Sequence, residues 1–224
     1  KELVAAHGSE LMRIAGENKC NYLFEASVGG GIPIIRPMKE SLTAEKIEAV
    51  TGILNGTTNY ILSKMEKEGA AFEDVLRQAQ EKGYAEKNPQ ADVEGHDACR
   101  KIAILSSLMC GKYVNYQDIY TEGITGITAE DFVYAHACGK TIKLLALSRT
   151  FQREGREEGL YAMVAPFMIS RSNPLFMVDD VFNAICVHSD RMGESMYYGK
   201  GAVKLPTASA VVSDVADCAR HAGK

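Results

Sequence analysis

An aspartate and a lysine stand four residues apart in an acidic stretch of the chain. Asp97 and Lys101 are followed at helical spacing by Ile104 and Leu108, so the four side chains form one stripe of a helix that starts near Gly95. The N-terminal half of the stripe is charged and its C-terminal half is apolar, so we expect Asp97 and Lys101 to lie at the edge of the core. A lysine at the mouth of a cleft suits proton transfer, because burial lowers its pKa and a carboxylate raises it. An exposed i,i+4 ion pair explains the same spacing, so both interpretations stay open.

Three consecutive glycines, at 29–31, follow a stretch at 20–28 whose aromatic and β-branched residues are typical of a strand. The glycines are not a dinucleotide-binding motif, and the segment 52–58 is not a phosphate-binding loop, because each lacks a required residue. A tight turn with unusual backbone angles explains them.

A cation site is the alternative interpretation of the same glycines. If the backbone stays extended, alternate carbonyl groups point the same way, at Val28, Gly30 and Ile32. With Glu25 they would surround a hard monovalent cation with oxygen atoms. The spacing leaves both interpretations open.

The chain has 224 residues, of which 46% are hydrophobic and 24% charged, with a formal net charge of -4. This composition is typical of a globular protein and argues against nucleic acid as a partner, and no apolar span is long enough for a membrane. The six cysteines are scattered and show no metal-ligand spacing. This pattern is typical of reduced thiols in a cytoplasmic protein. The chain begins with Lys1 and without a signal peptide, so we expect a piece of a longer protein.

Periodicity predicts helices and strands in alternation along the chain. Helices are expected at 2–14, 34–42, 58–68, 71–82, 95–110, after a capping box at Thr128, and at 209–219. Strands are expected at 20–28, 47–54, 140–149, 160–169 and 181–188, with turns at 153–155 and 172–174 between the last three. Short connections between consecutive strands favour antiparallel pairing. We therefore predict an α+β fold, with a mixed, largely antiparallel sheet and helices packed on one face.

Four segments, in order along the chain, resemble the signature blocks of homoserine dehydrogenase. They are Phe24–Ile34, Gly52–Asn59, Gly83–Lys101 and Leu205–Val212. The resemblance implies reduction of aspartate 4-semialdehyde to homoserine with NADPH or NADH, a step towards threonine, methionine and isoleucine. An amino-acid substrate of this kind needs carboxylates for its ammonium group, and the acidic loop supplies them.

The resemblance also implies roles for individual residues. Lys101 and Asp97 match the central catalytic pair, with Lys101 near the reacting oxygen and Asp97 hydrogen-bonded to substrate. Lys1 matches a second catalytic lysine. The remaining matches are Glu86 and Asp92 for the substrate ammonium, Tyr84, Gly56 and Thr57 for the lining of the site, Gly199, Gly201 and Ala202 for the cofactor, and Glu25, Val28, Gly30 and Ile32 for a monovalent cation such as sodium.

Three parts are expected from the resemblance. Residues 1–19 would be a helix at the edge of a missing nucleotide-binding domain, 20–198 the substrate-binding, catalytic and dimerisation domain, and 199–224 a return segment and helix. Two departures stand out: Val203 replaces a usual glycine, and Gln90–Asp92 keeps one acidic residue where two are common. We expect this chain alone to bind NADP(H) poorly and not to turn over.

Two competing functions are compatible with the residues. A phosphorylating semialdehyde dehydrogenase would need an activated cysteine with a histidine, for which Cys99 beside His96 is the candidate. A protein that keeps the fold as an amino-acid-binding or dimerisation module, without catalysis, is the other.

A homodimer is expected, because the predicted strands offer an apolar sheet face and family members pair through this sheet. The residues assigned to that face are Leu144, Met163, Phe167 and Ile185.

Overall fold

One mixed sheet of six strands, in the order β2-β4-β3-β1-β5-β6, forms the centre of the computed structural model, which describes residues 1–152 and 158–221. Neighbouring strands are antiparallel except β2 and β4, which are parallel. The strands are β1 (Ile47–Ile53), β2 (Tyr120–Thr121), β3 (Lys140–Phe151), β4 (Gly159–Ser170), β5 (Phe182–Ser189) and β6 (Gly193–Lys200). Four of the predicted strands are confirmed, and β2 and β6 were not predicted. The turn expected at 153–155 lies outside the described residues.

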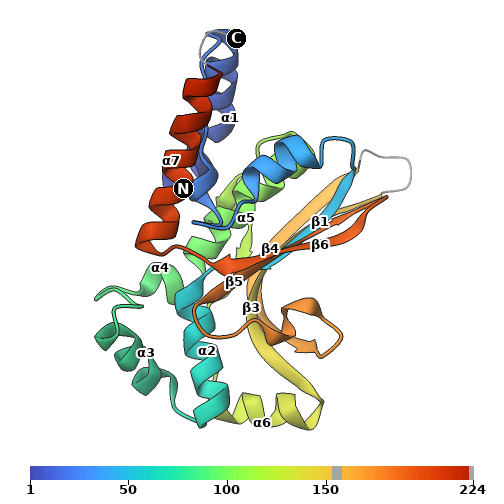
Figure 1. The fold of residues 1–224 in the computed structure, drawn as a ribbon. Coiled ribbons are helices and arrows are strands. Elements are labelled where there is room, and N and C mark those ends of the chain that lie inside the picture. The colour runs from blue at the N-terminus through green and yellow to red at the C-terminus, as the bar shows by residue number, and fades with distance from the viewer. Residues whose placement is uncertain (153–157, 222–224) are drawn as a thin grey trace.

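Helices α2 (Gly56–Glu68), α5 (His96–Cys110) and α6 (Ala129–Ala137) pack on one face of the sheet (Figure 1). Their buried side chains share one core cluster with Ile142 and Leu144 of β3. The opposite face carries a smaller cluster, in which Leu175 packs near Leu145. The predicted α+β fold with helices on one face is therefore confirmed. The other helices are α1 (Glu2–Glu17), α3 (Phe72–Glu81), α4 (Gln90–Val93) and α7 (Lys204–Arg220), with short 3-10 or π turns at Glu25–Ser27, Pro37–Ser41, Tyr116–Asp118 and Pro174–Met177.

Helix α5 carries the charged stripe deep into the core. It begins after Gly95, which has a φ of 82°, and ends at Gly111, whose φ is 65°. Asp97 and Lys101 are only 4% and 5% exposed, and Ile104 continues the stripe at 3%. The exposed ion pair considered above is therefore wrong: this pair sits inside the protein, where the first turn of α5 meets the end of β1.

Residues 20–28 do not form the predicted strand. The segment is irregular and contains the 3-10 turn Glu25–Ser27. Its hydrogen bonds explain the difference, because the Glu25 N–H donates to the carboxylate of Asp214 in α7 at 2.9 Å. A side chain from α7 thus satisfies a backbone group that a strand would pair with a neighbouring strand.

The three glycines allow two segments of backbone to touch. Gly30 has a φ of 61°, and a Cβ there would lie 2.6 Å from the Gly201 carbonyl oxygen. A Cβ at Gly31 would collide with Pro206. The tight-turn interpretation is confirmed, since the Ile32 N–H bonds the Gly29 carbonyl at 3.0 Å. The extended backbone assumed for a cation site is wrong.

Helices α1 and α7 project from the sheet at the same end of the molecule (Figure 1). Helix α7 exposes Val211, Val212 and Val215 at 49%, 65% and 64%, and Leu205 near its start is 78% exposed. A helix with this much exposed apolar surface is suited to contact with another part of a protein.

The apolar sheet face was assigned in part to the wrong residues. Leu144 and Ile185 belong to the core under the helices, at 3% and 0% exposure, whereas Met163 and Phe167 are only partly buried. Side chains alternate along a strand, so Leu144 and its neighbour Leu145 point to opposite faces.

A row of side chains crosses that opposite face. Met163 of β4 is in register with Leu147 of β3, Leu147 with Thr51 of β1, Thr51 with Cys186 of β5, and Cys186 with Met196 of β6. We call these five residues the outer row.

Candidate functional site

Two lysines converge on the buried carboxylate of Asp97. Lys101 Nζ lies 2.7 Å from Asp97 Oδ2, and Lys1 Nζ lies 2.8 Å from Oδ1. The two partners on α5 are one helical turn apart, while Lys1 arrives from the residue before α1. Lys101 also donates to the Leu54 carbonyl oxygen at 2.7 Å, which fixes its ammonium group at the end of β1. A buried charge persists only with partners of this kind.

Asn55 joins the cluster and was missed as a site residue. Its Nδ2 donates to Asp92 Oδ1 at 2.7 Å and to Asp97 Oδ2 at 2.9 Å. Its Oδ1 accepts from the Thr58 N–H at 2.9 Å, so one side chain caps α2 and binds both carboxylates. The Asn-Gly-Thr-Thr pattern is typical of a helix cap, but it carries no signal for the second contact.

The electrostatics keep the Asp97 carboxylate charged. Burial acts against ionisation of Asp97, but Lys101, Lys1 and Asn55 outweigh it and lower the pKa of the carboxyl to about 2. Burial lowers the pKa of the Lys1 ammonium, yet the contacts with Asp97 and Glu2 leave it above its ordinary value. Asp92 behaves differently, because burial raises its pKa although Asn55 bonds it. Asp97 is therefore a fixed anion, and Asp92 is the carboxylate that accepts a proton more readily.

The loop residues lie around the cluster at different depths. Thr57 Oγ1 donates to the Tyr84 carbonyl oxygen at 2.7 Å and ties the start of α2 to the loop. The Tyr84 ring packs edge-on against Tyr60, with centroids 5.0 Å apart. Glu86 is exposed, and its carbonyl oxygen accepts from Gln80. The structure thus brings together Lys1, Asp92, Asp97 and Lys101, with Gly56, Thr57 and Tyr84 beside them, and leaves Glu86 exposed in its loop.

Lys1 also faces a second region. It lines a cavity of about 530 Å³ together with Tyr22, Phe24 and residues of α7. Its ammonium group therefore stands between the buried carboxylate of Asp97 and the end of the molecule where α1 and α7 project.

Gly201 and Ala202 lie in the return segment between β6 and α7, packed against Gly30. Gly199 lies near the end of β6, in register with Asn183. The amide group of Asn183 occupies the space that a side chain at Gly201 would need, so the return segment is held closely against the sheet.

The carboxylate of Glu25 is engaged by backbone N–H groups. Its Oε1 accepts from the N–H groups of Ile34 and Ile35 at 2.6 and 2.8 Å, and its Oε2 accepts from that of Arg36 at 2.7 Å. Both carboxylate oxygens therefore accept hydrogen bonds from the backbone N–H groups at the start of a helical turn. The described residues contain no cluster of three or more His, Cys, Asp or Glu side chains suited to a metal, so a cation here would depend mainly on backbone carbonyl groups.

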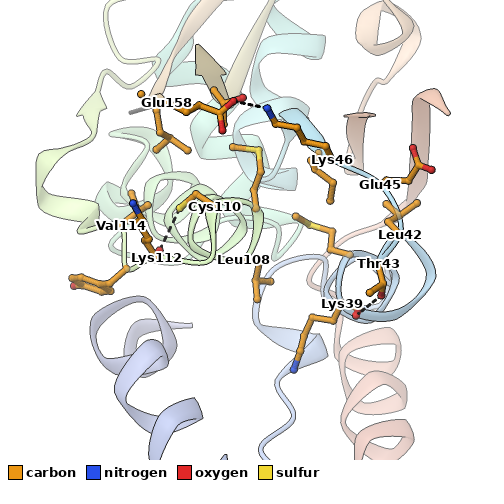
Figure 2. Close-up of a pocket in the computed structure, with 17 residues that line it drawn as sticks. Lys39, Leu42, Thr43, Glu45, Lys46, Leu108, Cys110, Lys112, Val114 and Glu158 are labelled. Carbon is orange, nitrogen blue, oxygen red and sulfur yellow. Dashed lines mark hydrogen bonds and ion pairs between the residues drawn. The ribbon is translucent and has the colours of Figure 1, made fainter. Parts of the chain in front are cut away.

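A large hollow lies away from this cluster. Its volume is about 930 Å³, and it is found where α5 ends, near Leu108 and Cys110, and where β1 begins, near Lys46 (Figure 2). Lys46 and Glu158 pair across it at 2.8 Å. It contains neither Asp97 nor Lys101.

A cysteine nucleophile finds no support. Cys99 is buried, its thiol donates to the Tyr116 carbonyl oxygen at 3.2 Å, and burial raises its pKa. An activated thiol needs the opposite shift. His96 is exposed and bonds Glu94 at 3.1 Å instead.

The fold and the site together define a class: an α+β domain with a lysine-rich polar cluster buried where an open sheet meets its helices. The family model for homoserine dehydrogenase matches residues 33–216. The chain therefore belongs to the homoserine dehydrogenase family. In the part of the chain that the structure describes, no helix has both the length and the apolar character to cross a bilayer.

Individual relatives agree with the family assignment. The homoserine dehydrogenase of Synechocystis sp. is 49% identical over 215 residues, which cover 96% of this chain and 49% of the relative. That of Bacillus subtilis is 45% identical over 96% of this chain and 48% of the relative. The chain thus spans about half the length of the curated relatives it matches.

Solved structures extend the similarity to the fold. A homoserine dehydrogenase from Thiobacillus denitrificans has a TM-score of 0.92 and 45% identity, covering 97% of this chain and 49% of the other. A hyperthermophilic archaeal homoserine dehydrogenase in complex with NADPH has a TM-score of 0.80 and 29% identity, covering 97% of this chain and 61% of the other.

Proposed function

We propose that the protein containing this chain is an NAD(P)-dependent homoserine dehydrogenase, and that the chain supplies the substrate half of its active site. The reaction would reduce aspartate 4-semialdehyde to homoserine, on the way to threonine, methionine and isoleucine. The observation that carries the proposal is the buried contact of Lys1 and Lys101 with Asp97, in a chain of this family.

The chemistry of the cluster suits this reaction. The nicotinamide cofactor supplies the hydride, and most of its binding surface would belong to the part of the protein outside this chain. As negative charge grows on the aldehyde oxygen, the Lys101 ammonium stabilises it and donates a proton. In the reverse direction the same amine takes the proton of the homoserine hydroxyl group.

The other groups would hold the substrate. Asp97 keeps Lys101 and Lys1 oriented and accepts a hydrogen bond from the substrate. Asp92 and Glu86 would bind the substrate ammonium, a charge-assisted contact that suits carboxylates. Glu86 is exposed in its loop, so binding by this residue requires the loop to close over the substrate. Tyr84, Gly56 and Thr57 would line the site.

The return segment is proposed to meet the cofactor. Gly199, Gly201 and Ala202 would approach the nicotinamide, with α7 and its exposed valines packed against the nucleotide-binding part of the protein. The division into 1–19, 20–198 and 199–224 is part of this proposal. A monovalent cation such as sodium is proposed to be bound by the carbonyl groups of Glu25, Val28, Gly30 and Ile32, because the Glu25 carboxylate already accepts backbone hydrogen bonds. The cytoplasm is the proposed location.

Turnover by the full-length protein is the test. It should oxidise NADPH only when aspartate 4-semialdehyde is present, with homoserine as the product identified by mass spectrometry. The isolated chain, lacking most of the cofactor surface, should bind NADPH weakly and form no homoserine. A full-length protein that binds homoserine but forms none from the semialdehyde would instead favour the amino-acid-binding or dimerisation module.

A further inference from the structure

A lysine that the proposed reaction does not use is buried completely in the sheet. Lys143 of β3 is 1% exposed, and its Nζ donates to the Val178 carbonyl oxygen at 2.8 Å and to Asp179 Oδ1 at 2.7 Å. Removing an ammonium group from water is costly, so a lysine in this place needs close partners. Both of its partners belong to the segment 178–182, which connects the turn Pro174–Met177 to β5.

The segment 178–182 lies along α2 and is tied to it at three points. Asn59 Nδ2 donates to the carbonyl oxygens of Val178 at 3.1 Å and Phe182 at 3.0 Å. The Asp180 N–H donates to Ser63 Oγ at 3.0 Å. At the last turn of α2, Lys67 Nζ lies 3.0 Å from Asp179 Oδ2. Lys143 thus links this segment, which also holds α2, to strand β3.

The same segment reaches the candidate site. A Cβ on Gly56 would lie 3.0 Å from the Val181 carbonyl oxygen, so the first turn of α2 rests directly on the segment. Asn55, the residue before Gly56, donates to Asp92 and Asp97. A shift of the segment along α2 would therefore move the amide group that holds both carboxylates.

We propose that Lys143 is a positioning residue: by fixing Val178 and Asp179 to β3, it holds α2 and the Asn55 amide against Asp92 and Asp97. The proposal rests on the proposed function, because it assigns Lys143 a part in placing the site at which that reaction occurs. Lys143 itself touches neither carboxylate of the cluster.

The charges around Asp179 provide a matched control. Burial acts to raise the pKa of Asp179, but hydrogen bonds from Lys143 and Lys67 bring it below its ordinary value. Lys67 shares this carboxylate from the surface: its side chain is 48% exposed, and it pairs with Asp179 at 3.0 Å and Asp180 at 3.8 Å. Replacing Lys67 therefore removes a charge from Asp179 without releasing the segment from the sheet.

The experiment compares Lys143→Met with Lys67→Met in the full-length protein. We expect Lys143→Met to lower kcat about 10- to 100-fold, as misplacement of a catalytic group does, with cofactor affinity unchanged. Lys67→Met should stay within about twofold of the parent. Combining Lys143→Met with Asn55→Ala should add little to the loss from Asn55→Ala alone, because both changes act through one group. Parent-like kcat in Lys143→Met, or losses that multiply in the double variant, would overturn the proposal.

Amide hydrogen exchange separates this proposal from the proposed function. Exchange at residues 55–59 should accelerate in Lys143→Met and not in Lys67→Met, whether or not the parent protein is active. Equal exchange in both variants rejects the positioning role. An inactive parent protein, with faster exchange only in Lys143→Met, rejects the homoserine dehydrogenase reaction and retains the positioning role. If Lys143→Met does not fold, Ser63→Ala removes the second tie to the segment and should show the same two effects in weaker form.

Discussion

At the scale of single residues, Asp97 organises the candidate site because it gathers both lysines and Asn55. Its neighbours on the helix were predictable, since the i,i+4 spacing places Lys101 one turn away. The depth of the pair and the approach of Lys1 were not, because they depend on how distant segments pack. The sequence resemblance supplied the role of Lys1, and the structure brings Lys1 to 2.8 Å from Asp97.

The depressed pKa of Asp97 makes stability depend on acidic pH. Its ordinary pKa of 3.8 falls to about 2 in the folded protein, which corresponds to about 2 kcal/mol of stability at neutral pH. Because the folded-state pKa is the lower one, this contribution is complete above about pH 4 and disappears as pH falls through 2. Asp97→Asn should lower the free energy of unfolding most at neutral pH.

Urea unfolding of the two proteins between pH 7 and pH 2 measures this effect. The difference between parent and Asp97→Asn should shrink below about pH 4, since a protonated aspartate resembles asparagine. A difference that stays constant across this range would mean that the lysine contacts do not stabilise the ionised carboxylate.

At the scale of elements, helices and strands with a regular hydrophobic period could be predicted from the sequence, whereas irregular segments could not. Helix α5 and strands β1, β3, β4 and β5 follow patterns that burial imposes on every turn or every second residue. Residues 20–28 have strand-like composition, but Asp214, nearly 190 residues away, takes the backbone hydrogen bond that a strand would make. Strand β6 was missed because its sequence, Gly193–Lys200, has glycines at or near both ends. Its exposed positions include the charged residues Glu194 and Lys200, which are less typical of a strand.

Gly95 sets where α5 begins and so places Asp97. Its φ is 82°, and a Cβ there would lie 3.2 Å from side chains of both Thr121 and Val164. Gly69, at the end of α2, has a φ of 62° and nothing within 4 Å. Gly69→Ala should cost about 1 kcal/mol through backbone strain alone. Gly95→Ala should cost about 2 to 3 kcal/mol, because crowding adds to that strain.

Thermal or urea unfolding of the two glycine variants gives the comparison. Gly95→Ala should also lower activity, since it shifts the first turn of α5, while Gly69→Ala should leave activity near the parent level. Equal destabilisation by the two changes would show that the space around Gly95 adjusts to a methyl group without cost.

At the scale of the whole molecule, the outer row suits contact with a second copy of the protein. It crosses five strands in register, and Met196 at its edge is 43% exposed beside Tyr198 at 52%. A row that is apolar apart from Thr51, on an open sheet face, is suited to an isologous interface, where the same surface meets itself. The homodimer remains a proposal, now based on the outer row in place of Leu144 and Ile185.

A charge in the outer row tests the dimer. Met196→Glu should convert a dimer into a monomer, because two carboxylates would be buried together across a twofold interface. Tyr134→Glu, which changes a 60% exposed tyrosine on α6, should leave the assembly intact. Light scattering of the full-length protein reports the mass directly. A dimer that survives Met196→Glu would place the interface on another surface.

The central claim is that Lys101 stabilises charge and transfers a proton at the reacting oxygen. Steady-state kinetics of Lys101→Ala in the full-length protein test it most directly, with Lys64→Ala, a partly exposed lysine paired to Glu68, as control. The account predicts that Lys101→Ala lowers kcat by roughly 10²- to 10⁴-fold while homoserine still binds, and that Lys64→Ala resembles the parent. An unchanged kcat in Lys101→Ala would contradict it.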